Sequence, residues 1–228
     1  MNVAIHQPQY LPWIPYFLKI KACDVFIFLD TVDFQKNGLQ NRNKIKTSQG
    51  GNWLTVPVQH KSGQKICDTL VDNSHSWQKK HWQTISQCYS KANSFHEHKD
   101  ELERFYAKKW CKLSQLNIEL SLMMMRWFDI KTPTIKSSEM NAAGSASELV
   151  LNLCLEAKAT EYLSGTGAEN YLRVEDFKKY GISINYQPPI LPESYPQLFL
   201  KAGFLNNISA LDIILNCGSS WKNHMPKL

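Results

Sequence analysis

The sequence predicts an α/β protein with a mostly parallel, doubly wound sheet that also carries a β-hairpin and a helical insert. Three observations support this fold class. Short apolar runs alternate with helical patterns near both ends of the chain, which is typical of parallel sheets. The apolar run 25–29 is unbroken, as expected for a strand buried on both faces. The middle stretch, 75–128, repeats its apolar residues at helical intervals instead.

The length and composition are those of one folded domain. The chain has 228 residues, of which 43% are hydrophobic and 20% charged, and this favours a single domain over residues 1–228. The net charge of +6 is spread along the chain. Such charge suits an anionic ligand such as a nucleotide, but no nucleic-acid partner is predicted, because no recognition-helix, zinc-finger or RNP-like pattern is present.

Cysteine usage and hydropathy favour a cytoplasmic protein. The six cysteines are far apart and form no C-x-x-C pair, which is typical of free thiols in a reducing compartment. No apolar run approaches the roughly 18 residues that cross a bilayer. Pro8 and Pro12 interrupt the N-terminus where a secretory signal would need an apolar core. We therefore expect no membrane span.

The first 30 residues predict a strand, a helix and a second parallel strand. The apolar run 3–5 stops at His6, and a loop stiffened by two prolines follows. Helical spacing covers 16–22, and the apolar run 25–29 ends at Asp30. Because ligands of open α/β sheets bind beyond the carboxyl ends of the strands, His6 and Asp30 mark a candidate site.

A β-hairpin and a group of helices are expected next. The extended segments 44–47 and 53–58 predict the hairpin, with Gly50-Gly51 as its turn. Since the hairpin follows the second strand, it would lie over the site as a lid or wall. The helical insert, 75–128, predicts three helices that form a cap or pack against the sheet.

Strands and helices alternate again after residue 132. We expect strands at 133–136, 161–164 and 182–186, and helices at 147–158, 174–180 and 209–216. Gly181 is the expected end of the second of these helices. Ser209 is the expected N-cap of the third.

Under this assignment, polar residues from four strand ends meet at one edge of the sheet. They are His6-Gln7, Asp30, Ser137-Ser138 and the turn Ser164-Gly165-Thr166-Gly167. An imidazole titrates near neutrality, so His6 is the candidate general acid or base, with a structural role in its loop as the alternative. Asp30 would hold an amine or ribose hydroxyls or orient His6; alternatively, it accepts hydrogen bonds from loop amides.

Further residues suit substrate binding. Asn41 and Arg42 suit recognition of a carboxylate or phosphate, with a role in joining the hairpin to the sheet as the alternative. The turn 164–167 could offer main-chain N–H groups to an anion, although such turns also occur for steric reasons. Ser137-Ser138 fits a helix-entry turn equally well. The other binding candidates are Gln7, Gln9, Tyr10, Trp13, Tyr171, Gln197 and Asp212.

No metal and no cofactor are predicted. The pair His96-x-His98 is the nearest approach to a metal motif. It lies in a hydrophilic stretch without a matching second pair of ligands, so it does not indicate a zinc site.

The chain resembles the WbqC-like family of bacterial proteins. The resemblance rests on segments in order, HQPQYLPW at 6–13, DVFIFLD at 24–30, NRNKIK at 41–46, WLTVPV at 53–58, SS at 137–138, YLSGTGA at 162–168, YPQ at 195–197, LD at 211–212 and Asn216-x-Gly218. It departs from the family's usual residues at Pro15, Thr31, Asp33 and Leu39. These departures suggest an altered substrate preference.

The resemblance implies a role beside surface-polysaccharide genes, as a glycine or aminoacyl transferase acting on amino sugars of O-antigen. We therefore expect an amide to form between an activated aminoacyl (glycyl) or acyl donor and the amine of a nucleotide-linked amino sugar. An acyl or aminoacyl carrier protein would be the partner. Two alternatives stay open, an ATP- or CTP-dependent nucleotidyl- or adenylyltransferase and a non-catalytic carrier-binding protein. A homo-oligomer is also left open.

Overall fold

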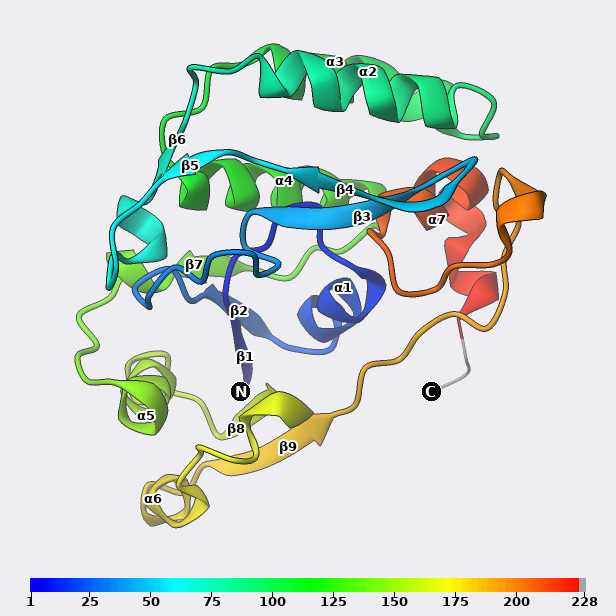
Figure 1. Ribbon diagram of the computed structural model, residues 1–228. Helices are drawn as coiled ribbons and strands as arrows, with labels where there is room; N and C mark the ends of the chain where they lie inside the picture. Colours follow the sequence, from blue (N-terminus) through cyan, green and yellow to red (C-terminus); the bar gives the residue numbers. More distant parts are fainter. Residues whose placement is uncertain (226–228) are drawn as a thin grey trace.

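A parallel sheet of five strands forms the centre of the protein in the computed structural model, which describes residues 1–225 (Figure 1). The strands are β1 (Asn2–His6), β2 (Val25–Phe28), β7 (Thr134–Lys136), β8 (Glu161–Gly165) and β9 (Ser183–Gln187). Their spatial order is β7-β2-β1-β8-β9, and every neighbouring pair is parallel. The predicted α/β fold class is confirmed.

The chain starts in the middle of the sheet and builds outward in both directions. It passes from β1 to β2 and β7 on one side, and then returns to β8 and β9 on the other. The strand order therefore reverses between β1 and β8. In open α/β sheets this reversal leaves a crevice beyond the carboxyl ends of the two strands, and ligands bind there.

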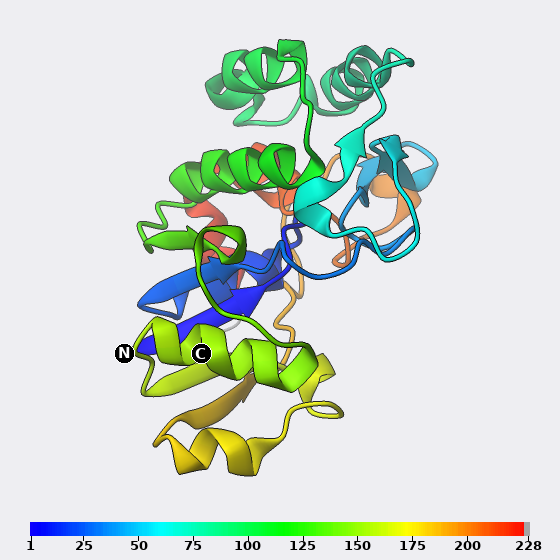
Figure 2. The same ribbon diagram turned by 90° about the vertical axis from the view of Figure 1, so that its left-hand side faces the viewer.

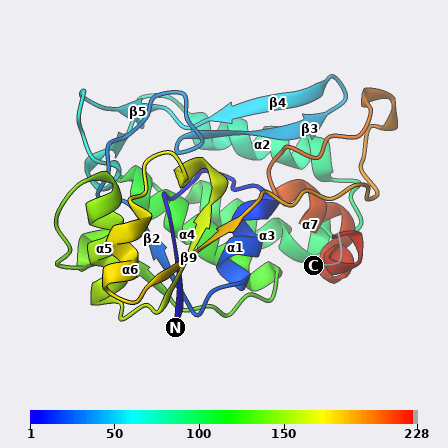
Figure 3. The same cartoon turned by 90° about the horizontal axis from the view of Figure 1, so that it is seen from below.

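Alternate residues of the strands face two apolar layers, which explains the unbroken apolar run of β2. Val3, Ile5 and Ile27 pack with α5 (Ala146–Glu156) and α6 (Val174–Lys179). Ala4 and the phenylalanines of β2 pack on the opposite face, with α1 (Ile14–Lys21) and α4 (Leu113–Trp127). Figures 1 and 3 show α5 and α6 on one side of the sheet and α1 on the other.

The stretch 75–128 consists of α2 (Trp77–Tyr89), α3 (Phe95–Ala107) and α4. The helix α4 lies next to the sheet, and α2 and α3 form an outer layer beyond it (Figure 2). Tyr10, from the loop after β1, reaches the outer layer, where its hydroxyl lies 2.7 Å from Nδ1 of His81 and 2.7 Å from the hydroxyl of Tyr106. The three helices share one apolar cluster with α1 and β2, so they are continuous with the main core.

The predicted hairpin is formed by β3 (Arg42–Thr47) and β4 (Gly50–Thr55), but the prediction of its turn is wrong. Gly50 pairs with Thr47 within the ladder, so the turn falls at Ser48-Gln49. Gly50 has φ +97°, a backbone conformation that glycine adopts readily because it has no Cβ. A second small sheet, of β5 (Val58–Gln59) and β6 (Leu70–Val71), was not predicted, since two-residue strands leave no periodic signal.

The last helix, α7 (Leu211–Cys217), begins two residues later than predicted. Its N-cap is Ala210, so the prediction of Ser209 as the N-cap is wrong, although Ser209 Oγ accepts a 3.1 Å hydrogen bond from the main-chain N–H of Leu211. Gly181 follows α6 with φ +72°, as a C-terminal glycine should. All six cysteines are free thiols. Within residues 1–225, no helix combines the length and apolar character needed to cross a membrane.

Candidate functional site

Two hollows lie at the carboxyl ends of β1 and β8, where the strand order reverses. The first lobe, of about 250 Å³, lies between the end of β1, α5 and the turn after β8. The second lobe, of about 220 Å³, lies between the start of α1, the same turn and the loop after β9. Both are lined by His6, Lys19, Gly165 and Gly167, so they form one two-lobed cleft.

The strand register explains why His6 and the turn after β8 meet. Ala4 of β1 pairs with Leu163 of β8, so two residues further along the parallel strands His6 is level with Gly165. His6 lies edge-to-face with Tyr16 of α1, with 5.1 Å between the ring centroids. The strand end and the first helix together set the position of the imidazole.

The imidazole of His6 is held neutral and in one orientation. Its Nδ1 lies 3.1 Å from the main-chain oxygen of Gln7. Because a carbonyl oxygen only accepts hydrogen bonds, this contact places the proton on Nδ1 and leaves Nε2 as a proton acceptor. Burial, and then the nearby Lys19 ammonium, lower the pKa of His6 to about 4. At pH 7 the ring is a neutral base lining both lobes.

Lys19 is the second polar group of the cleft. Its side chain is only 7% exposed, and within residues 1–225 its ammonium has no hydrogen-bond or ion-pair partner. Burial lowers its pKa to about 8, so most of the ammonium remains charged at pH 7. Helical side chains point toward the N-terminus of their helix, which directs Lys19 back to the end of β1.

The sequence interpretation missed Lys19. A lysine on a short helix is most often solvated, and spacing alone does not reveal its surroundings. The available signal was the composition of the helix, because all residues from Ile14 to Ile20 except Lys19 are apolar or aromatic. A helix that is apolar all round is buried, and a lysine within it is buried too.

The turn after β8 closes the cleft with main-chain atoms. Residues 166–168 form the 3₁₀ helix η3 (Thr166–Ala168), which begins directly after Gly165. A Cβ on Gly165 would lie 3.1 Å from Nζ of Lys19, so glycine allows this main chain to approach the ammonium closely. Ser164 and Tyr171, on either side of the turn, line the first lobe.

The charge of the cleft is positive. The residues that line the two lobes, all of them in the described part of the chain, include Lys19 but no aspartate or glutamate. An anionic ligand group would therefore meet no like charge there. In residues 1–225, no group of three or more His, Cys, Asp or Glu is arranged to hold a metal ion.

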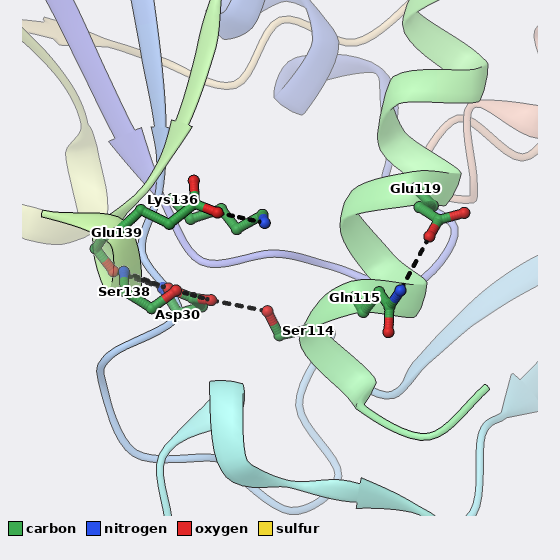
Figure 4. A network of polar contacts seen from close by, with 8 residues as sticks. Asp30, Ser114, Gln115, Glu119, Lys136, Ser138 and Glu139 are labelled. Carbon is green, nitrogen blue, oxygen red and sulfur yellow. Dashed lines mark hydrogen bonds and ion pairs between the residues drawn. The ribbon is translucent and has the colours of Figure 1, made fainter.

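Asp30 lies in a different polar cluster (Figure 4). Its carboxylate is 1% exposed and accepts hydrogen bonds from Ser114 Oγ (2.8 Å), Ser137 Oγ (3.0 Å), and the main-chain N and Oγ of Ser138 (3.0 and 2.9 Å). Asp30 therefore does contact Ser137 and Ser138, as predicted. None of these residues lines either lobe, so the cluster, which joins β2, α4 and the segment after β7, is not part of the cleft.

Comparison with known proteins assigns the chain to a family. The family model described as the WbqC-like protein family matches residues 7–224. The chain belongs to the WbqC-like family. "Uncharacterized protein Rv1507c" of Mycobacterium tuberculosis is 37% identical over 227 residues, covering 98% of this chain and 97% of that protein. No solved structure matches the chain. The resemblance stated from the sequence motifs is confirmed.

The motif-bearing loop after β1 of this WbqC-like protein divides between the cleft and the core. Gln7 lines the first lobe, and its Oε1 accepts a 2.8 Å hydrogen bond from Gln40. Trp13 lines the second lobe. Gln9 is 5% exposed and lines neither lobe, and Tyr10 is buried against α2 and α3.

The hairpin residues proposed for binding lie away from the cleft of the WbqC-like protein. Asn41 donates a 2.9 Å hydrogen bond from Nδ2 to the main-chain oxygen of Val56. The guanidinium of Arg42 stacks on Trp53, with 4.5 Å between its carbon and the ring centroid. No residue of β3 or β4 lines either lobe, so the hairpin does not form the lid or wall that was expected over His6.

Gln197 and Asp212, also proposed for binding, belong to a buried network beside α7. The carboxylate of Asp212 accepts hydrogen bonds from Tyr89 (2.7 Å), Tyr195 (2.8 Å) and Gln197 (3.0 Å). Lys46 of β3 donates to Oε1 of Gln197 at 2.9 Å. Burial raises the pKa of Asp212, while its hydrogen-bond donors oppose that shift. This network ties the hairpin to α2 and α7.

Proposed function

We propose that this WbqC-like protein forms an amide between an activated aminoacyl or acyl group and the amine of a nucleotide-linked amino sugar. The observation that carries the proposal is the meeting of His6 and Lys19 in one cleft at the strand-order reversal. A neutral imidazole supplies a proton acceptor. A buried ammonium attracts the anionic part of such a substrate.

The reaction needs a base because the attacking nitrogen must lose a proton to become an amide nitrogen. In the proposed step, the sugar's ammonium first loses one proton to water, and the neutral amine attacks the carbonyl carbon of the donor. Nε2 of His6 takes a second proton from this nitrogen as the C–N bond forms, and the bond from the carbonyl carbon to the thiol sulfur of a carrier thioester breaks. Because burial and Lys19 destabilise the protonated imidazole, the proton passes on readily to the leaving thiolate.

The sugar's polar groups fit the first lobe. Gln7 and Tyr171 line it and can exchange hydrogen bonds with hydroxyl groups. In this proposal Asp30 acts indirectly, since its oxygens already accept hydrogen bonds from serines. Its role is to hold the end of β2 in place beside the end of β1.

The test is a turnover assay read by mass spectrometry. Purified protein is incubated with a nucleotide-linked dideoxy-amino sugar and a glycyl or acyl thioester of a carrier protein, and the sugar nucleotide gains the glycyl or acyl mass. His6→Asn should lower kcat by about 10²–10⁴, the usual contribution of a general base. His75→Asn, which alters an exposed histidine outside the cleft, is the matched control. Full turnover by His6→Asn would refute the role of His6.

A nucleotidyl- or adenylyltransferase is the second candidate. It is favoured by the strand order, because mononucleotide-binding sheets also reverse beside their first strand. It predicts release of pyrophosphate from ATP or CTP with Mg²⁺. It also predicts thermal stabilisation by Mg²⁺ with ATP or CTP, and none by the sugar nucleotide.

A further inference from the structure

The two lobes of the cleft differ in the surfaces they present. The first lobe carries amide and phenol groups, from Gln7 and Tyr171. The second lobe is walled by the aromatic rings of Trp13 and Tyr16 and by three prolines, Pro15, Pro188 and Pro189. Polar groups suit a sugar, whereas an aromatic ring in an apolar wall suits stacking with a planar base.

Lys19 lies where the two lobes meet, because it lines both. Placing a charged ammonium in a site that is 7% exposed is costly unless the charge is paired. The described chain supplies no partner, and no carboxylate lines either lobe. The junction therefore fits an anionic group supplied by a ligand.

The main chain opposite Lys19 leaves room for that anion. Glycine stands at positions 165 and 167, and both glycines line the two lobes. Nothing lies within 4 Å of the position that a Cβ on Gly167 would occupy, so the space beside this turn is open. A side chain at 165 would instead approach Nζ of Lys19.

We infer that the cleft binds a nucleotide-linked sugar lengthwise, with its phosphates at Lys19, its nucleoside in the second lobe and its sugar in the first. In such a molecule the phosphates lie between the two rings, as Lys19 lies between the two lobes. Trp13 stacks on the base. The orientation places the sugar's amine beside His6. The sugar part of this inference rests on the proposed function, but the phosphate and nucleoside parts do not.

Binding of simple probes tests the phosphate site without any turnover. Isothermal calorimetry with UDP, dTDP, CDP, GDP and ADP should show that at least one nucleoside diphosphate binds the wild type. Lys19→Met should weaken that binding by at least about tenfold, since a phosphate loses its charged partner. Lys21→Met is the matched control, because Lys21 is an exposed lysine of the same helix. It should bind as the wild type does.

The variant should also fold. Lys19→Met replaces an unpaired buried ammonium with an apolar side chain of similar length, so its melting temperature should equal or exceed that of the wild type. Two results would overturn the phosphate site, namely no binding of any nucleoside diphosphate to the wild type, or equal binding to Lys19→Met. Phosphopantetheine is the other source of a phosphate. Its binding through Lys19 in place of every nucleoside diphosphate would overturn the nucleotide assignment.

Two further variants test the orientation. Trp13→Leu should weaken nucleoside diphosphate binding by about tenfold, since base–aromatic stacking contributes about 1–3 kcal/mol. Tyr171→Ala should leave it unchanged, because Tyr171 lies in the sugar lobe and is 46% exposed. The reverse result would refute the orientation.

The two proposals can fail separately. Nucleoside diphosphate binding that depends on Lys19, with no product from any donor, would retain the inference and reject the transferase. If Lys19→Met formed the amide with an unchanged KM for the sugar nucleotide, the transferase would be retained and the phosphate site at Lys19 rejected.

Discussion

Replacing Asp30 by asparagine should destabilise the fold through a specific set of lost contacts. The carboxylate is buried and accepts four hydrogen bonds from three serines. Asparagine has the same shape, but it offers one oxygen and an NH₂ group that only donates. The main-chain N–H of Ser138 cannot reverse its role, so the remaining oxygen must face it. The NH₂ group then faces the hydroxyls of Ser114 and Ser138, which must rotate to accept.

The size of the effect follows from the charge. A hydrogen bond to a charged group contributes about 1.5–3 kcal/mol, against about 0.5–1.5 kcal/mol for a neutral one. Asp30→Asn removes the charge and exchanges two of the four contacts, and such contacts are not additive. We expect the free energy of unfolding to fall by about 2–4 kcal/mol. Asp30→Ala should cost at least as much, since it leaves the buried serine groups without their acceptor.

Urea unfolding followed by tryptophan fluorescence measures this loss. The midpoint should move to lower urea at an unchanged slope. Asp33→Asn is the control, because Asp33 is an exposed aspartate close by in sequence, and it should unfold as the wild type does. If Asp30→Asn unfolded at the wild-type midpoint and yet abolished turnover, the carboxylate would act on the substrate and the structural argument would be refuted.

Three other predictions concern acid stability, the opening loop and the hairpin. Between pH 6.5 and 4, the free energy of unfolding should fall by up to about 3 kcal/mol for each of His6 and His81. Burial lowers both pKa values to about 4, so on acidification the unfolded chain binds protons before the folded chain does. Urea unfolding at a series of pH values should therefore show a smaller loss of stability per pH unit for His81→Gln than for the wild type. Asn117→Ala should cost about 2–3 kcal/mol in urea unfolding, because its buried amide donates to main-chain oxygens of residues 8 and 40; a loss below about 0.5 kcal/mol would contradict this. Arg42→Ala should cost under about 1 kcal/mol and leave nucleoside diphosphate affinity unchanged, since the guanidinium stacks on Trp53. A large loss of affinity in calorimetry would place Arg42 at the ligand.

Local patterns predicted the elements that depend on local interactions. The unbroken apolar run at 25–29 predicted the central strand β2, because β2 has a packed helical layer on each face. Gly181 follows the end of α6 as predicted, because a helix end of this kind depends on the backbone conformation of the glycine itself. The hairpin turn was misplaced because Gly50 serves a ladder position, and glycine alone does not distinguish a turn from a strand.

The candidate site was predicted only in part. His6 and the turn 164–167 do meet, since adjacent parallel strands bring their carboxyl ends to one edge. Asp30 also ends a neighbouring strand, but its carboxylate is held by Ser137 and Ser138 from another part of the chain. The direction in which a strand-end side chain points depends on such distant hydrogen-bond donors. The spacing of residues along the sequence does not identify these donors.

The sequence by itself determined the fold class, the family and the strand ends that carry polar residues, because periodicity, turn chemistry and motif order are properties of neighbouring residues. Only the tertiary structure decided which of those residues share a cavity. It placed Lys19 in the cleft and moved Asp30, Gln197 and Asp212 into buried networks. The physical reason is that burial and pairing are set by residues far apart in the sequence, such as Lys46 and Gln197, which are 151 positions apart.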